Sequence, residues 1–140
     1  MKFSNAEVDP PNPECMKEFP DAKENCMFAQ NLYQHIKVPL FPAQSLYDSW
    51  SISYILNLDC IQNGISTCSQ EDRNLIEDNR RNVTDILRRI SKDSKNGVYG
   101  LGCVWHGLLD NPAYMLRKIN VPQYSQWTPG AALGAWMESP

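Results

Sequence analysis

The 140-residue sequence has no long apolar run, no excess of positive charge and only two histidines. No stretch of 18 apolar residues occurs, which excludes a membrane-spanning helix in this sequence. The first residues lead into no apolar segment either, so any targeting signal is expected to lie outside this chain. Thirteen lysines and arginines against sixteen aspartates and glutamates give a net charge of −3. This balance leaves no basic patch of the kind that binds nucleic acid.

The five cysteines fall into two close pairs, Cys15 with Cys26 and Cys60 with Cys68, plus Cys103. Zinc sites use closely spaced Cys-x-x-Cys pairs or added histidines, and neither occurs here, so no metal site is expected. The spacing favours short-range disulfides within the pairs, with buried free thiols as the alternative. Cys103 is either a small buried residue or the partner of a cysteine outside this chain.

Two features indicate the secretory route. Disulfides form and persist in oxidising compartments. Asn82 begins the triplet Asn-Val-Thr, which is an N-glycosylation acceptor pattern. We therefore expect a glycoprotein that is secreted or held in a secretory or vacuolar lumen.

The chain divides into an irregular, cysteine-containing segment at residues 1–30, rich in proline and polar residues, and an α/β portion at residues 31–140. Residues 29–37 have helical spacing, and the uncharged apolar run at 40–46 predicts a strand. Ser69 is placed to cap a long one-faced helix, and residues 97–105 predict a second strand. The apolar positions of that helix are Leu75, Ile76, Val83, Ile86, Leu87 and Ile90.

A strand, a long helix and a second strand predict a βαβ unit with parallel strands. The basic residues of the long helix are expected to form a solvated face. Further helices are expected over 111–119 and 129–137, the second with Leu133 and Trp136 as its packing residues. Parallel strands end at the same edge of a sheet, so Asp48 and His106, one after each strand, should lie close together.

An acid and a histidine at neighbouring strand ends are two members of a catalytic triad. A histidine that takes a proton from a serine needs a carboxylate on its other ring nitrogen. In α/β-hydrolases the triad follows the order serine, acid, histidine, which places the serine before Asp48. No Gly-x-Ser-x-Gly occurs, and the nearest approach, GISTC at 64–68, lacks the closing glycine. From the pattern alone, Asp48 and His106 also fit ordinary polar surface residues, and His35 fits a structural role.

The residues around these two positions resemble one known family. IKVPLF at 36–41 and LYDSW at 46–50 resemble the IKTPLF and AYDSW segment of the pectin acetylesterase and Notum family. GCVWH at 102–106 resembles its Cys-x-x-His segment, and AALGAW at 131–136 is similar to its closing helix. The likeness spans nearly the whole chain but only the C-terminal half or less of a family member.

The resemblance implies the C-terminal portion of an α/β-hydrolase-like domain, a mostly parallel sheet with flanking helices. Asp48 would be the triad acid and His106 the base of a serine carboxylesterase, an O-deacetylase or O-deacylase that needs no cofactor. The family's serine elbow has no counterpart here, so a missing N-terminal half or a companion chain would supply the serine. This chain alone would then be inactive.

The substrate implied by the resemblance is an acylated polysaccharide or an acylated protein. The alternative is a non-catalytic relative that acts as a structural or binding subunit in a larger assembly.

Overall fold

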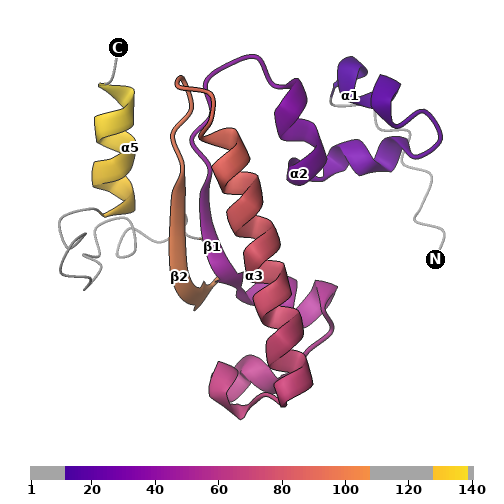
Figure 1. The fold of residues 1–140 in the computed structure, drawn as a ribbon, viewed down its shortest axis with the longest axis vertical. Helices are drawn as coiled ribbons and strands as arrows, with labels where there is room; N and C mark the ends of the chain where they lie inside the picture. The colour runs from indigo at the N-terminus through magenta and orange to yellow at the C-terminus, as the bar shows by residue number, and fades with distance from the viewer. Residues whose placement is uncertain (1–11, 108–127, 139–140) are drawn as a thin grey trace. The chain divides into compact units, whose positions relative to one another are not determined.

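The computed structural model describes residues 12–107 and 128–138 (Figure 1). The chain divides into two compact units, Met1–Pro39 and Leu40–Pro140, whereas the sequence predicted a boundary at residue 30. The helix expected over 111–119 lies outside the described residues.

The first unit contains short helical segments and a cap that starts the first of them. Asn12 caps α1, because its side-chain oxygen accepts hydrogen bonds from the backbone N–H groups of Glu14 and Cys15 at 2.9 and 3.2 Å. Pro13 takes the first helical position, where a missing N–H costs nothing. This segment was predicted to be irregular, but asparagine and proline are typical both of loops and of helix starts. The segments are α1 (Pro13–Glu18), η1 (Lys23–Met27), α2 (Ala29–Leu32) and η2 (Tyr33–His35).

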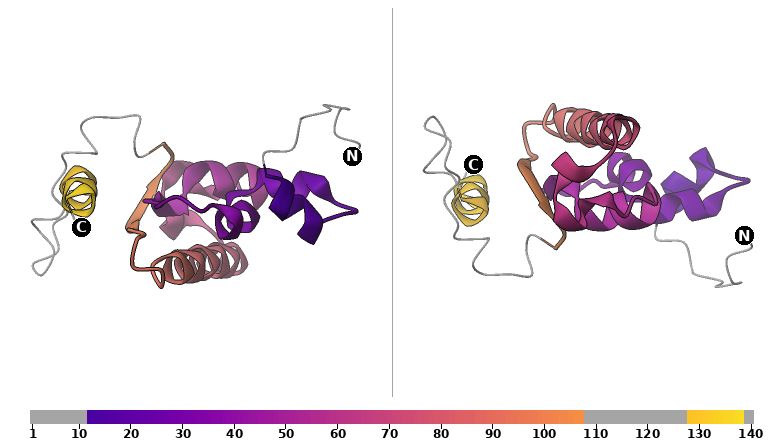
Figure 2. Two further views of the ribbon diagram at one scale, coloured as in Figure 1. Left: turned by 90° about the horizontal axis from the view of Figure 1, so that it is seen from above. Right: turned by 90° about the horizontal axis from the view of Figure 1, so that it is seen from below.

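The second unit contains the strand, helix and strand that the sequence predicted. β1 (Ala43–Asp48) and β2 (Tyr99–Trp105) pair in parallel, and α3 (Gln70–Ile90) lies between them in the chain. Both views in Figure 2 show α3 on one side of the two strands. This βαβ unit confirms that the ends of β1 and β2 meet at one edge.

Two prolines determine where β1 begins. Pro39 and Pro42 both precede the strand, which starts at Ala43 rather than at the beginning of the predicted run 40–46. The carbonyl of Pro42 accepts a hydrogen bond from the N–H of Tyr99 at 2.9 Å. Proline has no N–H to donate, so it lies where only its carbonyl pairs with the neighbouring strand.

α3 buries one face, as its apolar spacing predicted. Ser69 caps it, its hydroxyl accepting from the N–H of Asp72 at 3.1 Å. Ile76 and Leu87 are buried, but Leu75 is 45% exposed. Successive helical residues point about 100° apart, so Ile76 takes the core side and leaves Leu75 at its flank. In the described part of the chain no helix is long and apolar enough to span a membrane.

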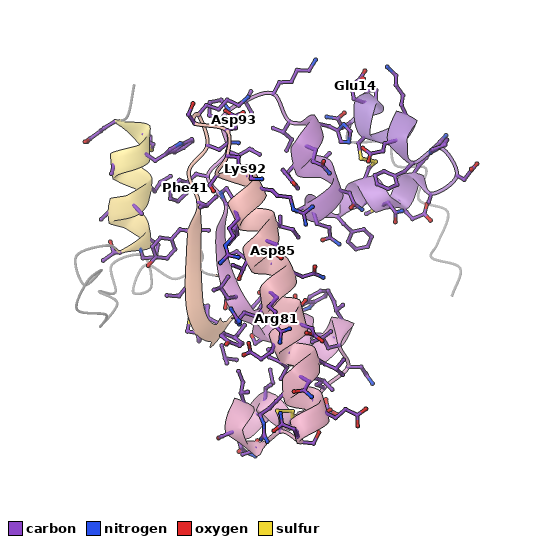
Figure 3. All side chains as sticks on the ribbon, viewed as in Figure 1. Glu14, Phe41, Arg81, Asp85, Lys92 and Asp93 are labelled. Atoms are coloured by element: carbon purple, nitrogen blue, oxygen red, sulfur yellow. A yellow bond between two sulfur atoms is a disulfide. The ribbon has the colours of Figure 1, made fainter. Side chains whose placement is uncertain are left out.

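Three of the four arginines in the basic run of α3, Arg81, Arg88 and Arg89, are exposed, as predicted. Arg81 is 3.1 Å from Asp78, and Arg88 is 3.2 Å from Asp85, each pair three residues apart. All four side chains are more than half exposed, and Figure 3 shows Arg81 and Asp85 along the helix. Such exposed pairs contribute little to stability, and each neutralises an arginine locally.

The core of the second unit lies where α3 begins. Ile52, Cys68 and Ile76 form its buried centre. The partly buried residues packed against this centre are Tyr47, Leu56, Leu58, Cys60, Ile61 and Ile65. Most of these residues come from the segment between Asp48 and α3, so this segment is held firmly beside the end of β1.

Both predicted disulfides are present, and both link residues close in sequence (Figure 3). Cys15 is bonded to Cys26 and Cys60 to Cys68, with Cα atoms 5.9 and 5.0 Å apart. The second bridge closes the loop that contains η4 (Cys60–Asn63) and η5 (Ile65–Thr67). Bridges of this kind are typical of oxidising compartments.

The last helix, α5 (Pro129–Met137), has the predicted bounds. Thr128 caps it by accepting from the N–H of Ala131 at 3.0 Å. Trp136 packs as expected: its ring centre is 5.3 Å from that of Phe41, and its Nε1–H donates to the carbonyl of Lys95 at 3.0 Å. Phe41 is labelled beside α5 in Figure 3.

Candidate active site

Asp48 and His106 meet at the edge where β1 and β2 end. Asp48 is the last residue of β1, and His106 directly follows β2. His106 Nδ1 lies 2.8 Å from Asp48 Oδ2. The aspartate side chain is 8% exposed and the histidine side chain 58% exposed. A buried carboxylate therefore holds one nitrogen of an imidazole whose ring is open to solvent.

The carboxylate is itself held by a second hydrogen bond. The backbone N–H of Ser51 donates to Asp48 Oδ1 at 2.7 Å. The helical stretch that includes the π-helix η3 (Ser51–Ile55) starts directly after Asp48, so Asp48 is its cap. An aspartate directly before a helical pattern is the sequence signal for this contact, which the sequence-based interpretation did not include.

The arrangement equips His106 to act as a base. When Nδ1–H donates to Asp48, the lone pair of the neutral ring is on Nε2. Nε2 can then take a proton from a hydroxyl, and the carboxylate stabilises the imidazolium that forms. This is the division of roles expected of a triad acid and base.

An aromatic residue flanks the imidazole. The Trp50 and His106 rings are stacked, with centres 6.0 Å apart and planes inclined by 29°. Trp50 also lies 5.5 Å from the ring of Tyr54, which is one helical turn further on. The sequence placed Trp50 next to the acid but gave no sign that its ring would reach the histidine.

No serine or cysteine is hydrogen bonded to the histidine in the part of the chain that the structure describes. Among residues 12–107 and 128–138, no serine or cysteine side chain is hydrogen bonded to His106. Ser45 is 1% exposed, and its hydroxyl donates to the carbonyl of Cys103. Ser66, in the GISTC segment, lies in η5 and follows no strand. The described residues thus bring together an acid and a base.

A polar contact ties β1 to α3 one residue before the acid. The hydroxyl of Tyr47 donates to Glu77 Oε1 at 2.7 Å, and Arg80 Nε donates to Glu77 Oε2 at 2.7 Å. Burial, followed by the Glu77 hydrogen bond, raises the pKa of Tyr47. The Tyr47 and Arg80 hydrogen bonds lower the pKa of Glu77, the tyrosine contributing most. The contact anchors α3 beside the dyad.

The remaining candidate residues lie away from Asp48 in sequence. In the first unit, His35 Nε2 is 3.0 Å from Glu18 Oε2, which fits the structural role expected of it. Asn82 is exposed on α3, and its glycosylation stays a prediction. The described ranges hold no group of three or more His, Cys, Asp or Glu side chains arranged to bind a metal ion.

Comparison with known proteins decides the family. The model of the family described as Pectinacetylesterase matches residues 2–140. The chain belongs to the pectinacetylesterase family. The family resemblance of the sequence is thereby confirmed.

Two crystal structures of the Wnt deacylase Notum from Drosophila share the fold of this pectinacetylesterase family chain. Crystal form I matches with a TM-score of 0.67 and 24% identity, and form II with 0.66 and 23%. Each match covers 88% of this chain but only 31% and 30% of the Notum chains. The likeness confirms the α/β-hydrolase-like fold, and the chain spans about a third of the length of these relatives.

Proposed function

We propose that this chain supplies the acid and the base of a serine carboxylesterase. The observation that carries the proposal is the 2.8 Å contact between Asp48 Oδ2 and His106 Nδ1 at the shared edge of two parallel strands. Membership of an esterase family supports ester hydrolysis as the reaction. Asp48 is the orienting acid, and Nε2 of His106 is the group that moves protons.

The reaction follows the two-step course of serine hydrolases. Nε2 of His106 takes the proton of a serine hydroxyl as its oxygen attacks the ester carbonyl. The imidazolium then returns this proton to the departing alcohol oxygen, which leaves an acyl-enzyme. A water molecule gives its proton to Nε2 and attacks the acyl carbon. Finally, the proton passes to the serine oxygen as the carboxylic acid is released.

The serine and the N–H groups that bind the carbonyl oxygen come, in this proposal, from a missing N-terminal half or from a companion chain. The support for this is that the chain spans about a third of the Notum length and that His106 has no hydrogen bond to a serine or cysteine side chain within the described ranges. Losing one donor of an oxyanion hole alone costs about 10²–10³-fold in kcat. Without both parts, the chain by itself is expected to be inactive.

The proposed substrates are acylated polysaccharides or acylated proteins. These two classes are represented by the names of the family and of the similar structure, Pectinacetylesterase and Wnt deacylase. The two disulfides and the exposed acceptor Asn82 support a location outside the cell or in a secretory or vacuolar lumen.

Hydrolysis of p-nitrophenyl acetate by the full-length protein tests the proposal. His106→Ala is expected to lower kcat by about 10³-fold or more, because acid–base catalysis is lost. His35→Gln replaces the other histidine of this chain and should leave kcat unchanged. Activity of His106→Ala within tenfold of wild type would contradict the assignment. A native protein with the mass of this chain, without a serine-bearing partner and without activity, would instead support the non-catalytic alternative.

A further inference from the structure

The pairing of β1 with β2 changes register just before the dyad. Ser45 lies opposite Leu101, but Tyr47 lies opposite Val104. Between these two pairs β1 has one residue and β2 has two, residues 102–103. This is a β-bulge in β2, a feature that bends a strand and redirects the side chains that follow it.

The bulge determines how far His106 lies from its acid along the sheet. Beyond it, Asp48 is opposite Trp105, so His106 is one residue past the level of Asp48. An uninterrupted ladder would pair Asp48 with Val104 and leave His106 two residues past it. One strand residue spans about 3.3 Å, which is comparable to a whole hydrogen-bond length. In this sequence the contact at 2.8 Å therefore depends on the shift of register that the bulge introduces.

Ser45 is the side chain that completes the hydrogen bonding at the bulge. It is 1% exposed, its hydroxyl donates to the carbonyl of Cys103, and it accepts from the N–H of Tyr47 at 3.2 Å. A bulge leaves backbone groups without their ladder partners, and buried unpaired groups are costly. The single hydroxyl pairs with one such group on each strand, the carbonyl of Cys103 on β2 and the N–H of Tyr47 on β1.

We propose that Ser45 is a positioning residue for the dyad: its hydroxyl holds the bulge of β2 and thereby sets the register that places His106 against Asp48. The kinetic consequence rests on the proposed esterase function, whereas the effect on the His106 contact does not. Ser45 acts through the backbone and takes no part in the chemistry.

The test compares variants of the full-length protein with ¹⁵N-labelled histidine. Ser45→Ala should abolish the low-field Nδ1–H resonance of His106 and lower kcat for p-nitrophenyl acetate about 100-fold, with KM within twofold, since misplacement by about 1 Å costs that much. Ser45→Thr keeps the hydroxyl and should restore both. Ser69→Ala is the matched control, because it removes the cap of α3 far from the bulge in sequence. It should lower the melting temperature without moving the His106 resonance.

A second variant covers the case in which Ser45→Ala does not fold. Ser45→Cys keeps the size of the side chain but replaces the hydroxyl with a weak S–H donor, and it should also abolish the resonance. The proposal is overturned if Ser45→Ala, or Ser45→Cys where Ser45→Ala is unfolded, keeps the resonance with kcat within threefold of wild type. It is also overturned if Ser69→Ala has the same effects as Ser45→Ala. A wild-type protein that shows the resonance but hydrolyses no ester would refute the esterase function. The positioning role of Ser45 would then be tested by the effect of its variants on the resonance alone.

Discussion

Replacing Asp48 with asparagine keeps the shape of the side chain but exchanges one acceptor oxygen for an NH2 donor. In the native site both oxygens accept hydrogen bonds, Oδ2 from His106 at 2.8 Å and Oδ1 from the N–H of Ser51 at 2.7 Å. An asparagine can satisfy only one of these two donors. If its NH2 faces Ser51, two donors meet. If it faces His106, it donates to Nδ1 and the ring proton moves to Nε2.

The second orientation removes the base, because a protonated Nε2 cannot take the proton of a serine. In serine hydrolases the wrong tautomer lowers kcat about 10⁴-fold, or about 5.4 kcal/mol of transition-state stabilisation. The first orientation leaves a buried donor unpaired, which costs about 1–3 kcal/mol of stability. Asp48→Asn should therefore reduce catalysis far more than stability.

The assay measures kcat for p-nitrophenyl acetate and the urea unfolding midpoint of the full-length protein at pH 7. Asp59→Asn is the matched control: Asp59 is exposed and makes no side-chain cap bond to η4, so both values should match wild type. A kcat within tenfold of wild type for a folded Asp48→Asn protein would refute the role of Asp48.

Three further predictions concern stability. Replacing both cysteines of the Cys60–Cys68 bridge with serine, at a separation of 8 residues, should lower the free energy of unfolding by about 2.5 kcal/mol in urea titrations. Tyr47→Phe removes the hydrogen bond that lowers the pKa of Glu77 most. The stabilisation from this bond is present above pH 4.5, the ordinary pKa of a glutamate, and is lost as the pH falls through the lowered pKa of Glu77. Urea unfolding should therefore show a greater loss for Tyr47→Phe at pH 7 than at pH 2.5. Gly97→Ala places a Cβ against the ring of Phe41 and should cost about 1–3 kcal/mol in thermal melting.

Each of these has a contradicting result. An unchanged urea midpoint after loss of the second bridge would show that it constrains the unfolded chain little. An equal loss for Tyr47→Phe at both pH values would remove Glu77 from the explanation. A melting temperature of Gly97→Ala equal to wild type would mean that the Phe41 ring moves aside without cost.

The elements with strong local signals could be predicted from the sequence. α3 begins after Ser69, where the hydroxyl cap predicted its start, and it includes all the predicted apolar positions up to Ile90. The meeting of Asp48 and His106 followed from a general rule, since two parallel strands joined by a helix end at one edge. The two disulfides could also be predicted, because each joins cysteines that are close in sequence.

Features set by contacts between distant segments could not be predicted. The bulge at residues 102–103 depends on which backbone groups of β1 and β2 pair, and these lie more than fifty positions apart in the chain. The role of the Ser45 hydroxyl could not be predicted either, because it pairs with backbone groups that only this register brings next to it. The stacking of Trp50 on His106 requires the helical stretch after Asp48 to turn back over the strand ends. Periodicity describes the face of one element and carries no information on such cross-chain geometry.

Labelling of the full-length protein with a fluorophosphonate probe, followed by peptide mapping, tests the central claim most directly. We expect a single labelled serine outside the 140 residues of this chain, in the missing N-terminal half or in a companion chain. Labelling should be lost or strongly slowed in His106→Ala and Asp48→Asn, and unchanged in His35→Gln. Equal labelling rates for wild type and His106→Ala, or a labelled serine within residues 12–107, would contradict the assignment of Asp48 and His106 as acid and base.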